Sequence, residues 1–177
     1  MPDSKELWNL KFSVEVSTRY HDWRRAMLGT YVDLVRIITL LGAGLSLMGL
    51  VAKEQWTVAI AVSCAVIAVV TLADIGFGLD EKARRHTDIY RRFKSLQSDM
   101  ARHQSDWETK LAEWEAQAQE IRQDEPAVLW ALYVRSWNQT ILRHNADSAF
   151  RRQIRWWHLL LGRFFRFRPE SFPFIRA

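Results

Sequence analysis

The chain has 177 residues, a formal net charge of +5 and 49% apolar residues. It contains only seven Gly and four Pro, and its polar segments are rich in helix-forming residues, which argues against a β-sheet domain. The single cysteine, Cys64, cannot supply a disulfide framework or a thiolate metal site within one chain. We therefore expect an all-α fold.

Residues 1–30 predict an N-terminal cytoplasmic helix. Leu7, Leu10 and Val14 recur at helical spacing, and Ser4 is a candidate N-cap. The aromatic residues on this segment suit either packing on other helices or contact with lipid headgroups, and its acidic residues favour packing. No apolar core precedes residue 31, so we expect no cleavable signal peptide.

Residues 31–79 predict a transmembrane helical hairpin. The apolar runs Leu34–Ala52 and Trp56–Leu79 each have the length of a membrane span, and only Lys53–Gln55 separate them. Backbone groups in lipid must be bonded internally, so both runs should be helical, and the short link makes them antiparallel. Five Lys or Arg precede the hairpin and six follow it within residues 80–94, against one in the link. This distribution predicts that both termini are cytoplasmic.

Small and polar residues recur every three or four positions in both predicted spans. Such residues let helix backbones approach closely, and the same stripe could line a pore formed by several chains. Both interpretations, helix packing and pore lining, stay open. Pore lining would require several chains, because one hairpin cannot enclose a channel. The stripe comprises Thr39, Gly42, Ser46, Gly49, Thr57, Cys64 and Thr71.

Arg36 and Asp74 are the charges placed deepest in the two runs. Counted along the helices from Glu54 they reach matching depths, about 27 and 30 Å away. They could pair across the hairpin or form a charged ring at its inner mouth. Extension of each side chain to the headgroups is the alternative.

Residues 80–125 show a heptad pattern that predicts one long cytoplasmic helix. A straight helix from Asp80 to Gln123 would be about 66 Å long, and it must bury its seam on its own chain or on neighbouring chains. The predicted seam comprises His86, Tyr90, Phe93, Met100, Trp107, Leu111, Trp114 and Ile121.

Residues 126–177 predict a second cytoplasmic helix followed by a basic, aromatic tail. Pro126 suits the first turn of a helix that folds back antiparallel along the heptad helix, completing a long cytoplasmic helical hairpin. Arg151–Arg168 would form an amphipathic helix that binds the membrane, although arginines among stacking aromatics also suit single-stranded RNA. We expect Pro169–Ala177 to be extended. The predicted contacts are Arg151, Arg152, Arg155, Trp156, Trp157, Arg163, Phe164 and Arg166.

The sequence shows no pattern typical of catalysis. It lacks a nucleophile elbow, a phosphate-binding Gly loop and a close pair of histidines at metal-ligand spacing. We therefore expect no catalytic residues, no cofactor, no metal and no small-molecule substrate.

The segments around the hairpin resemble a known family. Arg19-Tyr20-His21 precedes the hairpin, and Phe77–His86 runs into Tyr90–Leu96 after it. Over about residues 8–125 this arrangement is similar to the SLATT family, bacterial two-transmembrane effector domains of conflict systems. The resemblance implies an oligomeric effector of antiphage defence (abortive infection) that permeabilises the bacterial inner membrane. We expect no fused sensor domain, so the trigger would be a separate nucleotide-signalling protein or a retron-like reverse transcriptase with its RNA. The alternative function is a non-toxic membrane scaffold that recruits a protein or nucleic acid through the heptad helix and the Arg-rich tail.

Overall fold

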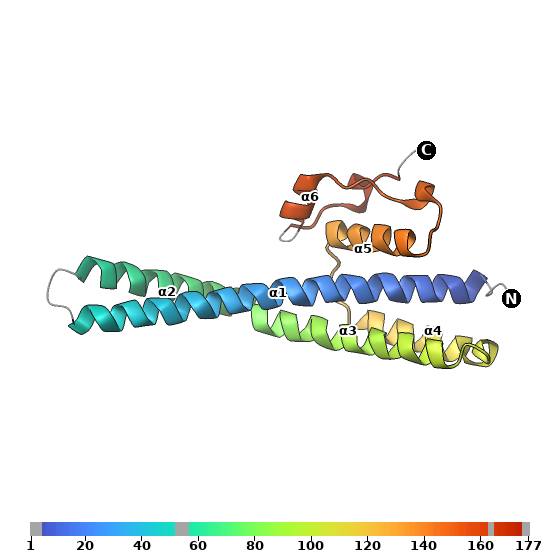
Figure 1. The fold of residues 1–177 in the computed structure, drawn as a ribbon, viewed down its shortest axis with the longest axis horizontal. Helices are drawn as coiled ribbons and strands as arrows, with labels where there is room; N and C mark the ends of the chain where they lie inside the picture. Colours follow the sequence, from blue (N-terminus) through green and yellow to red (C-terminus); the bar gives the residue numbers. More distant parts are fainter. Residues whose placement is uncertain (1–4, 52–56, 163–164, 175–177) are drawn as a thin grey trace. The chain divides into compact units, whose positions relative to one another are not determined.

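The computed structural model describes residues 5–51, 57–162 and 165–174, and these residues form helices with no strand. The chain divides into two compact units. We call residues 5–24 and 86–174 the bundle unit, and residues 25–85 the apolar unit. The helices are α1 (Lys5–Val51), α2 (Thr57–Phe77), α3 (Leu79–Arg102), α4 (Trp107–Gln123), α5 (Trp130–Arg143) and α6 (Trp156–Leu161), with short 3-10 turns at Ser148–Phe150 and Pro169–Ser171 (Figure 1).

The bundle unit has its main core between the first turns of α1 and the α3–α4 pair. Figure 1 shows α3 and α4 lying side by side. The side chains that fill this core are almost fully buried, and each large aliphatic or Phe side chain contributes about 1.5–3 kcal/mol by leaving water. They are Leu7, Leu10, Val14, Ile89, Phe93, Leu96, Met100, Trp114, Ala118 and Ile121, with Trp107 and Leu111 at the margin.

The prediction of one long helix over residues 80–125 is wrong, because the helix breaks between Arg102 and Trp107. The intervening His-Gln-Ser-Asp sequence contains good turn formers, and Thr109 N–H donates to the Asp106 carbonyl at 3.2 Å. The indole of Trp114 donates to Asp99 at 2.7 Å and so joins the two helices across the turn. The heptad seam is therefore buried by the chain folding on itself and on α1.

The predicted seam residues divide into two groups by burial. His86, Phe93, Met100, Trp114 and Ile121 are buried, whereas Tyr90, Trp107 and Leu111 are partly exposed. Trp107 and Leu111 pack against the margin of the main core.

The opposite face of α1 packs on α5. The prediction that α5 packs along the heptad helix is therefore wrong. Phe12 and Val16 of α1 are buried with Ile141 of α5. The ring of Phe12 meets the edge of Trp137 at 4.8 Å between centroids. α5 begins at Trp130 and not at Pro126, because residues 125–129 form an extended connection. The first half of α1 is thus buried on two sides.

The prediction of a single amphipathic helix over Arg151–Arg168 is also wrong. Among the described residues of this range, α-helix is confined to Trp156–Leu161, and Arg152 forms an isolated antiparallel bridge with Phe174. The expectation of an extended ending is wrong at Pro169–Ser171, which form a 3-10 turn. A small core holds this lobe on α5, formed by Ala131, Val134 and Phe172 with Trp130, Ile154 and Phe167 beside it.

The apolar unit contains the second half of α1 and all of α2. A Cβ on Gly42 would lie 2.7 Å from the side chain of Ile67, and the Ser46 hydroxyl lies 3.5 Å from the Cys64 sulfur. Rising numbers on α1 therefore meet falling numbers on α2, so the two helices are antiparallel. α1 continues through the predicted boundary at residue 30 without a break.

Both helices of the apolar unit are long and apolar enough to cross a membrane, by length and composition. None of the residues of α2 is buried. Large apolar side chains are exposed along both helices: Leu34, Ile37, Leu40, Leu41, Leu45, Leu47, Met48, Val58, Val62, Val66, Val69, Leu72, Ile75 and Phe77. Gly78, with φ +54°, lets the chain leave α2 and enter α3, since L-residues rarely adopt that angle.

Candidate functional site

The stripe of small and polar residues lies partly inside the apolar unit. Gly42, Ser46 and Cys64 lie where α1 meets α2, as the contacts above show. The Ser46 hydroxyl also donates to the carbonyl of Gly42 at 2.9 Å, so its hydrogen bond is satisfied within the helix. These three residues thus allow close approach of the two helices.

The remaining stripe residues are placed differently. Thr39 is half-buried and donates to the carbonyl of Val35 at 2.9 Å. Thr57 and Thr71 are exposed on α2. Gly49 belongs to α1, but its surroundings lie outside the described residues. The two exposed threonines therefore lie on the surface of α2.

Arg36 and Asp74 do not pair with each other in the structure. The Arg36 guanidinium lies 3.3 Å from Asp33 and 3.7 Å from Asp80. Asp80 also accepts from Arg84 at 2.7 Å. The Oδ1 oxygen of Asp74 is buried and has no hydrogen-bond partner among the described residues. A carboxylate in such an apolar helix is costly unless it finds a partner, a proton or water.

The bundle unit contains a buried polar chain that sequence reasoning missed. Nδ1 of His21 lies 2.8 Å from Nδ1 of His86, and Nε2 of His21 lies 3.2 Å from a carboxylate oxygen of Glu125. A carboxylate accepts, so Nε2 of His21 donates to Glu125, and one hydrogen bond joins the two Nδ1 atoms. Both rings are buried. His21 and His86 each end one of the motifs quoted for the family resemblance, but neither motif shows that the two rings meet.

Tyr20 closes this polar chain on one side. Its ring meets the His21 and His86 rings edge-on, at 5.0 and 6.1 Å between centroids. Its hydroxyl accepts from the backbone N–H of Leu129 at 3.1 Å, which fixes the connection that leads into α5. Burial raises the pKa of the Tyr20 hydroxyl above its ordinary value, although the hydrogen bond from Leu129 opposes this. The arrangement links α1, α3 and the start of α5.

A second polar cluster surrounds Glu15 on α1. Burial raises the pKa of this carboxyl, but hydrogen bonds from His144 and Arg19 and the charge of Arg143 outweigh burial and lower it. His144 lies 2.8 Å away and Arg143 lies 3.1 Å away, both on the last turn of α5 or just after it. The cluster therefore fastens α5 to α1 by charge, beside the apolar contact of Phe12.

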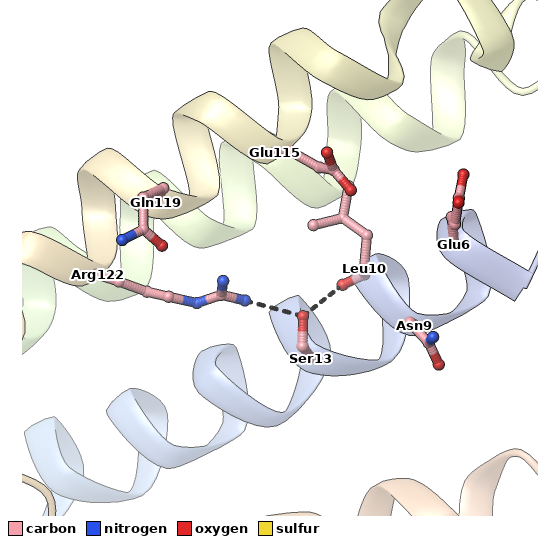
Figure 2. Close-up of a pocket in the computed structure, with 7 residues that line it drawn as sticks. All are labelled: Glu6, Asn9, Leu10, Ser13, Glu115, Gln119 and Arg122. Atoms are coloured by element: carbon pink, nitrogen blue, oxygen red, sulfur yellow. Dashed lines mark hydrogen bonds between the residues drawn. The ribbon is translucent and has the colours of Figure 1, made fainter.

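An open groove of about 570 Å³ lies between α1 and α4 (Figure 2). At one end Arg122 donates to the Ser13 hydroxyl at 2.9 Å, and Ser13 donates to the Leu10 carbonyl at 2.9 Å. Glu6 and Glu115 carry the opposite charge toward the other end. Because the lining mixes both signs and Arg122 is engaged, the groove lacks the concentrated positive charge that a phosphate site requires.

The predicted tail contacts gather in the lobe that follows α5. Arg152 donates to the Phe172 carbonyl at 3.2 Å and lies over the Phe174 ring at 4.3 Å. Its backbone exchanges two hydrogen bonds with the Asn138 side chain. Trp157 packs on His158 and Phe167. Arg152 and Trp157 are therefore structural parts of the lobe.

The other predicted contacts are more exposed. Arg155, Trp156 and Arg166 are exposed, and Arg151 is half-buried with its Nε unbonded among the described residues. Arg163 and Phe164 lie outside the described residues. The prediction from sequence thus combined residues that build the lobe with residues that form its surface.

Within the described ranges, no group of three or more His, Cys, Asp or Glu is arranged to hold a metal ion. Comparison with known proteins adds no relative, since no family model, curated protein or solved structure matches this chain. The resemblance to the SLATT family therefore rests on the residues quoted above.

Proposed function

We propose that this protein is a non-enzymatic membrane effector of a bacterial antiphage defence system. When a separate sensor triggers it, several copies permeabilise the inner membrane. The observation that carries the proposal is the exterior of the apolar unit, where large apolar side chains cover both helices. Exposure of so much apolar surface to water is unfavourable, whereas in lipid the same surface is solvated.

The proposed topology places α1 and α2 across the membrane with both termini in the cytoplasm. The bundle unit has an ordinary buried core and charged side chains outside it, which suits water. The excess of Lys and Arg on both sides of the hairpin supports the cytoplasmic assignment.

Permeabilisation requires more than one chain, because two helices cannot enclose a channel. Most of the heptad seam is buried within the chain, so we assign the contacts between copies to the apolar unit. Thr57 and Thr71 remain exposed there, and Asp74 has a buried oxygen without a partner among the described residues. We propose that Asp74 completes its hydrogen bonding only in the assembled, triggered state.

Leakage from liposomes tests the proposal. Purified protein in anionic liposomes should release ions or a small dye when its trigger is present, and Asp74→Asn should reduce that release at equal incorporation. Ser63 of α2, whose hydroxyl is already bonded to the Ala59 carbonyl at 2.8 Å, supplies the control variant Ser63→Ala. If the wild type releases neither ions nor dye in any triggered state, while its expression is harmless and partner binding is retained, the scaffold function would be favoured instead.

A further inference from the structure

The lobe after α5 presents an apolar surface that its own core does not use. Trp156 is 72% exposed and Leu160 is 52% exposed, one helical turn apart on the same face of α6. Leu161 and Phe165 are 46% and 62% exposed, and the Phe165 N–H bonds to the Leu161 carbonyl at 2.9 Å. Four large apolar side chains therefore lie within ten residues of chain. We call Trp156, Leu160, Leu161 and Phe165 the lobe patch.

The lobe patch is held in place by a rigid inner face. His158 is buried against the rings of Phe167 and Phe172, at 4.9 and 4.8 Å between centroids. A Cβ on Gly162 would lie 2.3 Å from the Cβ of Ala131, so only glycine lets the end of α6 approach α5 this closely. The outward direction of Trp156 and Leu160 follows from this packing.

Cations flank the lobe patch directly in sequence. Arg155 precedes Trp156, and Arg166 and Arg168 follow Phe165, and all three are exposed. Residues 151–177 hold seven Arg and one acidic residue, so their net charge of +6 exceeds the +5 of the whole chain. The surface thus combines exposed apolar groups with a strong positive charge.

We propose that the lobe patch docks on an anionic lipid surface, with its apolar side chains at the level of the headgroups and acyl boundary and its arginines on the lipid phosphates. Aromatic residues with arginines also bind single-stranded RNA by stacking, but Leu160 and Leu161 have no ring on which a base could stack. Aliphatic side chains gain from entering the acyl boundary, and each nearby arginine adds attraction to anionic lipid. The two leucines therefore favour lipid over RNA.

The inference rests on the proposed membrane insertion, so the test measures docking of the lobe patch and insertion of the hairpin separately. Full-length protein with Cys64→Ser receives one new cysteine at Trp156, at Val66 in α2 or at the exposed Ala112 in α4, and each is labelled with an environment-sensitive dye. The proteins are reconstituted in phosphatidylcholine liposomes with or without phosphatidylglycerol, and brominated lipids serve as quenchers.

We expect the dye at position 156 to shift to the blue and to be quenched only when phosphatidylglycerol is present. The dye at 66 should be quenched in both lipids, and the dye at 112 in neither. Replacing Arg155, Arg166 and Arg168 together by Gln should lower the docked-to-free ratio about fivefold per arginine. The matched replacement of the exposed Arg91, Lys94 and Arg102 of α3 removes the same charge and should leave quenching at 156 unchanged.

Three results would overturn the docking proposal. The first is that the dye at 156 is not quenched while the dye at 66 is. The second is that both triple replacements reduce quenching at 156 equally. The third is a blue shift at 156 on addition of single-stranded RNA to neutral liposomes, which would assign the surface to RNA. Absence of quenching at 66 would instead overturn the proposed insertion.

Discussion

The contact between His21 and His86 joins the two sequence motifs that flank the hairpin. A single hydrogen fits between the two Nδ1 atoms at 2.8 Å, and Nε2 of His21 donates to Glu125 at 3.2 Å. Truncation of either ring leaves a buried polar atom without its partner as well as a cavity. The contact therefore fixes α1 against α3 at a point where apolar packing alone would allow sliding.

We predict that His21→Ala and His86→Ala each lower the free energy of unfolding of the bundle unit by about 2–4 kcal/mol. Because the two rings bond to each other, the double variant should lose less than the two single losses added, by at least about 0.5 kcal/mol. Chemical denaturation in detergent micelles, followed by tryptophan emission, measures this. His103→Ala, on the partly exposed His103, is the control and should change stability little. If the loss in the double variant equals the sum of the two single losses, the two rings are not coupled.

His158 gives the protein a specific sensitivity to mild acid. Burial, followed by the nearby charge of Arg155, lowers the pKa of His158 below its ordinary value of 6.5. Below pH 6.5 the unfolded chain therefore binds more protons than the folded chain. The stability that neutral His158 supports is complete near neutral pH and decreases as the pH falls below about 6.5. His158→Phe keeps an aromatic ring against Phe167 and Phe172 and should flatten this loss. Melting midpoints between pH 8 and 5 measure it, and a slope as steep as that of the wild type would refute it.

Glu15 acts in a separate and lower window of pH. The pKa of this carboxyl is lowered from its ordinary value of 4.5, so its contribution is complete above that value and is lost as the pH falls through the lowered value. The hydrogen bonds from His144 and Arg19 supply the contribution. Glu15→Gln should therefore leave the slope between pH 6.5 and 5 intact and reduce the further loss below about pH 4.5. This difference separates the two groups in one set of melting curves.

At the scale of the helices, α1 and α2 approach closely where a glycine of α1, Gly42, faces α2. A Cβ on Gly42 would meet Ile67 at 2.7 Å, whereas a Cβ on Gly44 has nothing within 4 Å. We predict that Gly42→Leu destabilises the hairpin by about 1–3 kcal/mol through overpacking and that Gly44→Leu changes it little. Thermal unfolding in detergent compares the two. Equal effects would place the contact between α1 and α2 elsewhere.

The helices also show how far the sequence determines the fold. The all-helical content and the two long apolar helices were predicted, because apolar length and helical spacing need no knowledge of neighbours. The break between Arg102 and Trp107 was not, because a heptad pattern is satisfied equally by one long helix and by two helices folded on each other. The same holds for Arg151–Arg168, where alternation of cations and aromatics fits a helix but the buried ring of Phe172 holds the chain in a lobe.

The candidate sites were predictable to a smaller extent for a related reason. Gly42, Ser46 and Cys64 follow from small residues at helical spacing, and the structure places them where α1 meets α2. The contact of His21 with His86 joins residues 65 positions apart, so no local pattern reveals it. Asp74 and Arg36 share a depth by counting, yet Asp33 and Asp80 lie closer to the guanidinium.

At the scale of the whole molecule, the charge distribution predicts which parts of the chain share a compartment. In cells, with Cys64→Ser as background, a cysteine at Lys53 in the link should react with a membrane-impermeant maleimide, since the proposed topology places the link outside. A cysteine at Ala112 on α4 should react only after the inner membrane is permeabilised, because the Lys and Arg beside the hairpin predict that the bundle unit is cytoplasmic. Labelling of both in lysed cells shows that each thiol is accessible. Labelling of position 112 but not 53 in intact cells would invert the topology, and labelling of neither would place the link inside lipid or protein. Only the predicted pattern leaves the bundle unit where a cytoplasmic sensor could reach it.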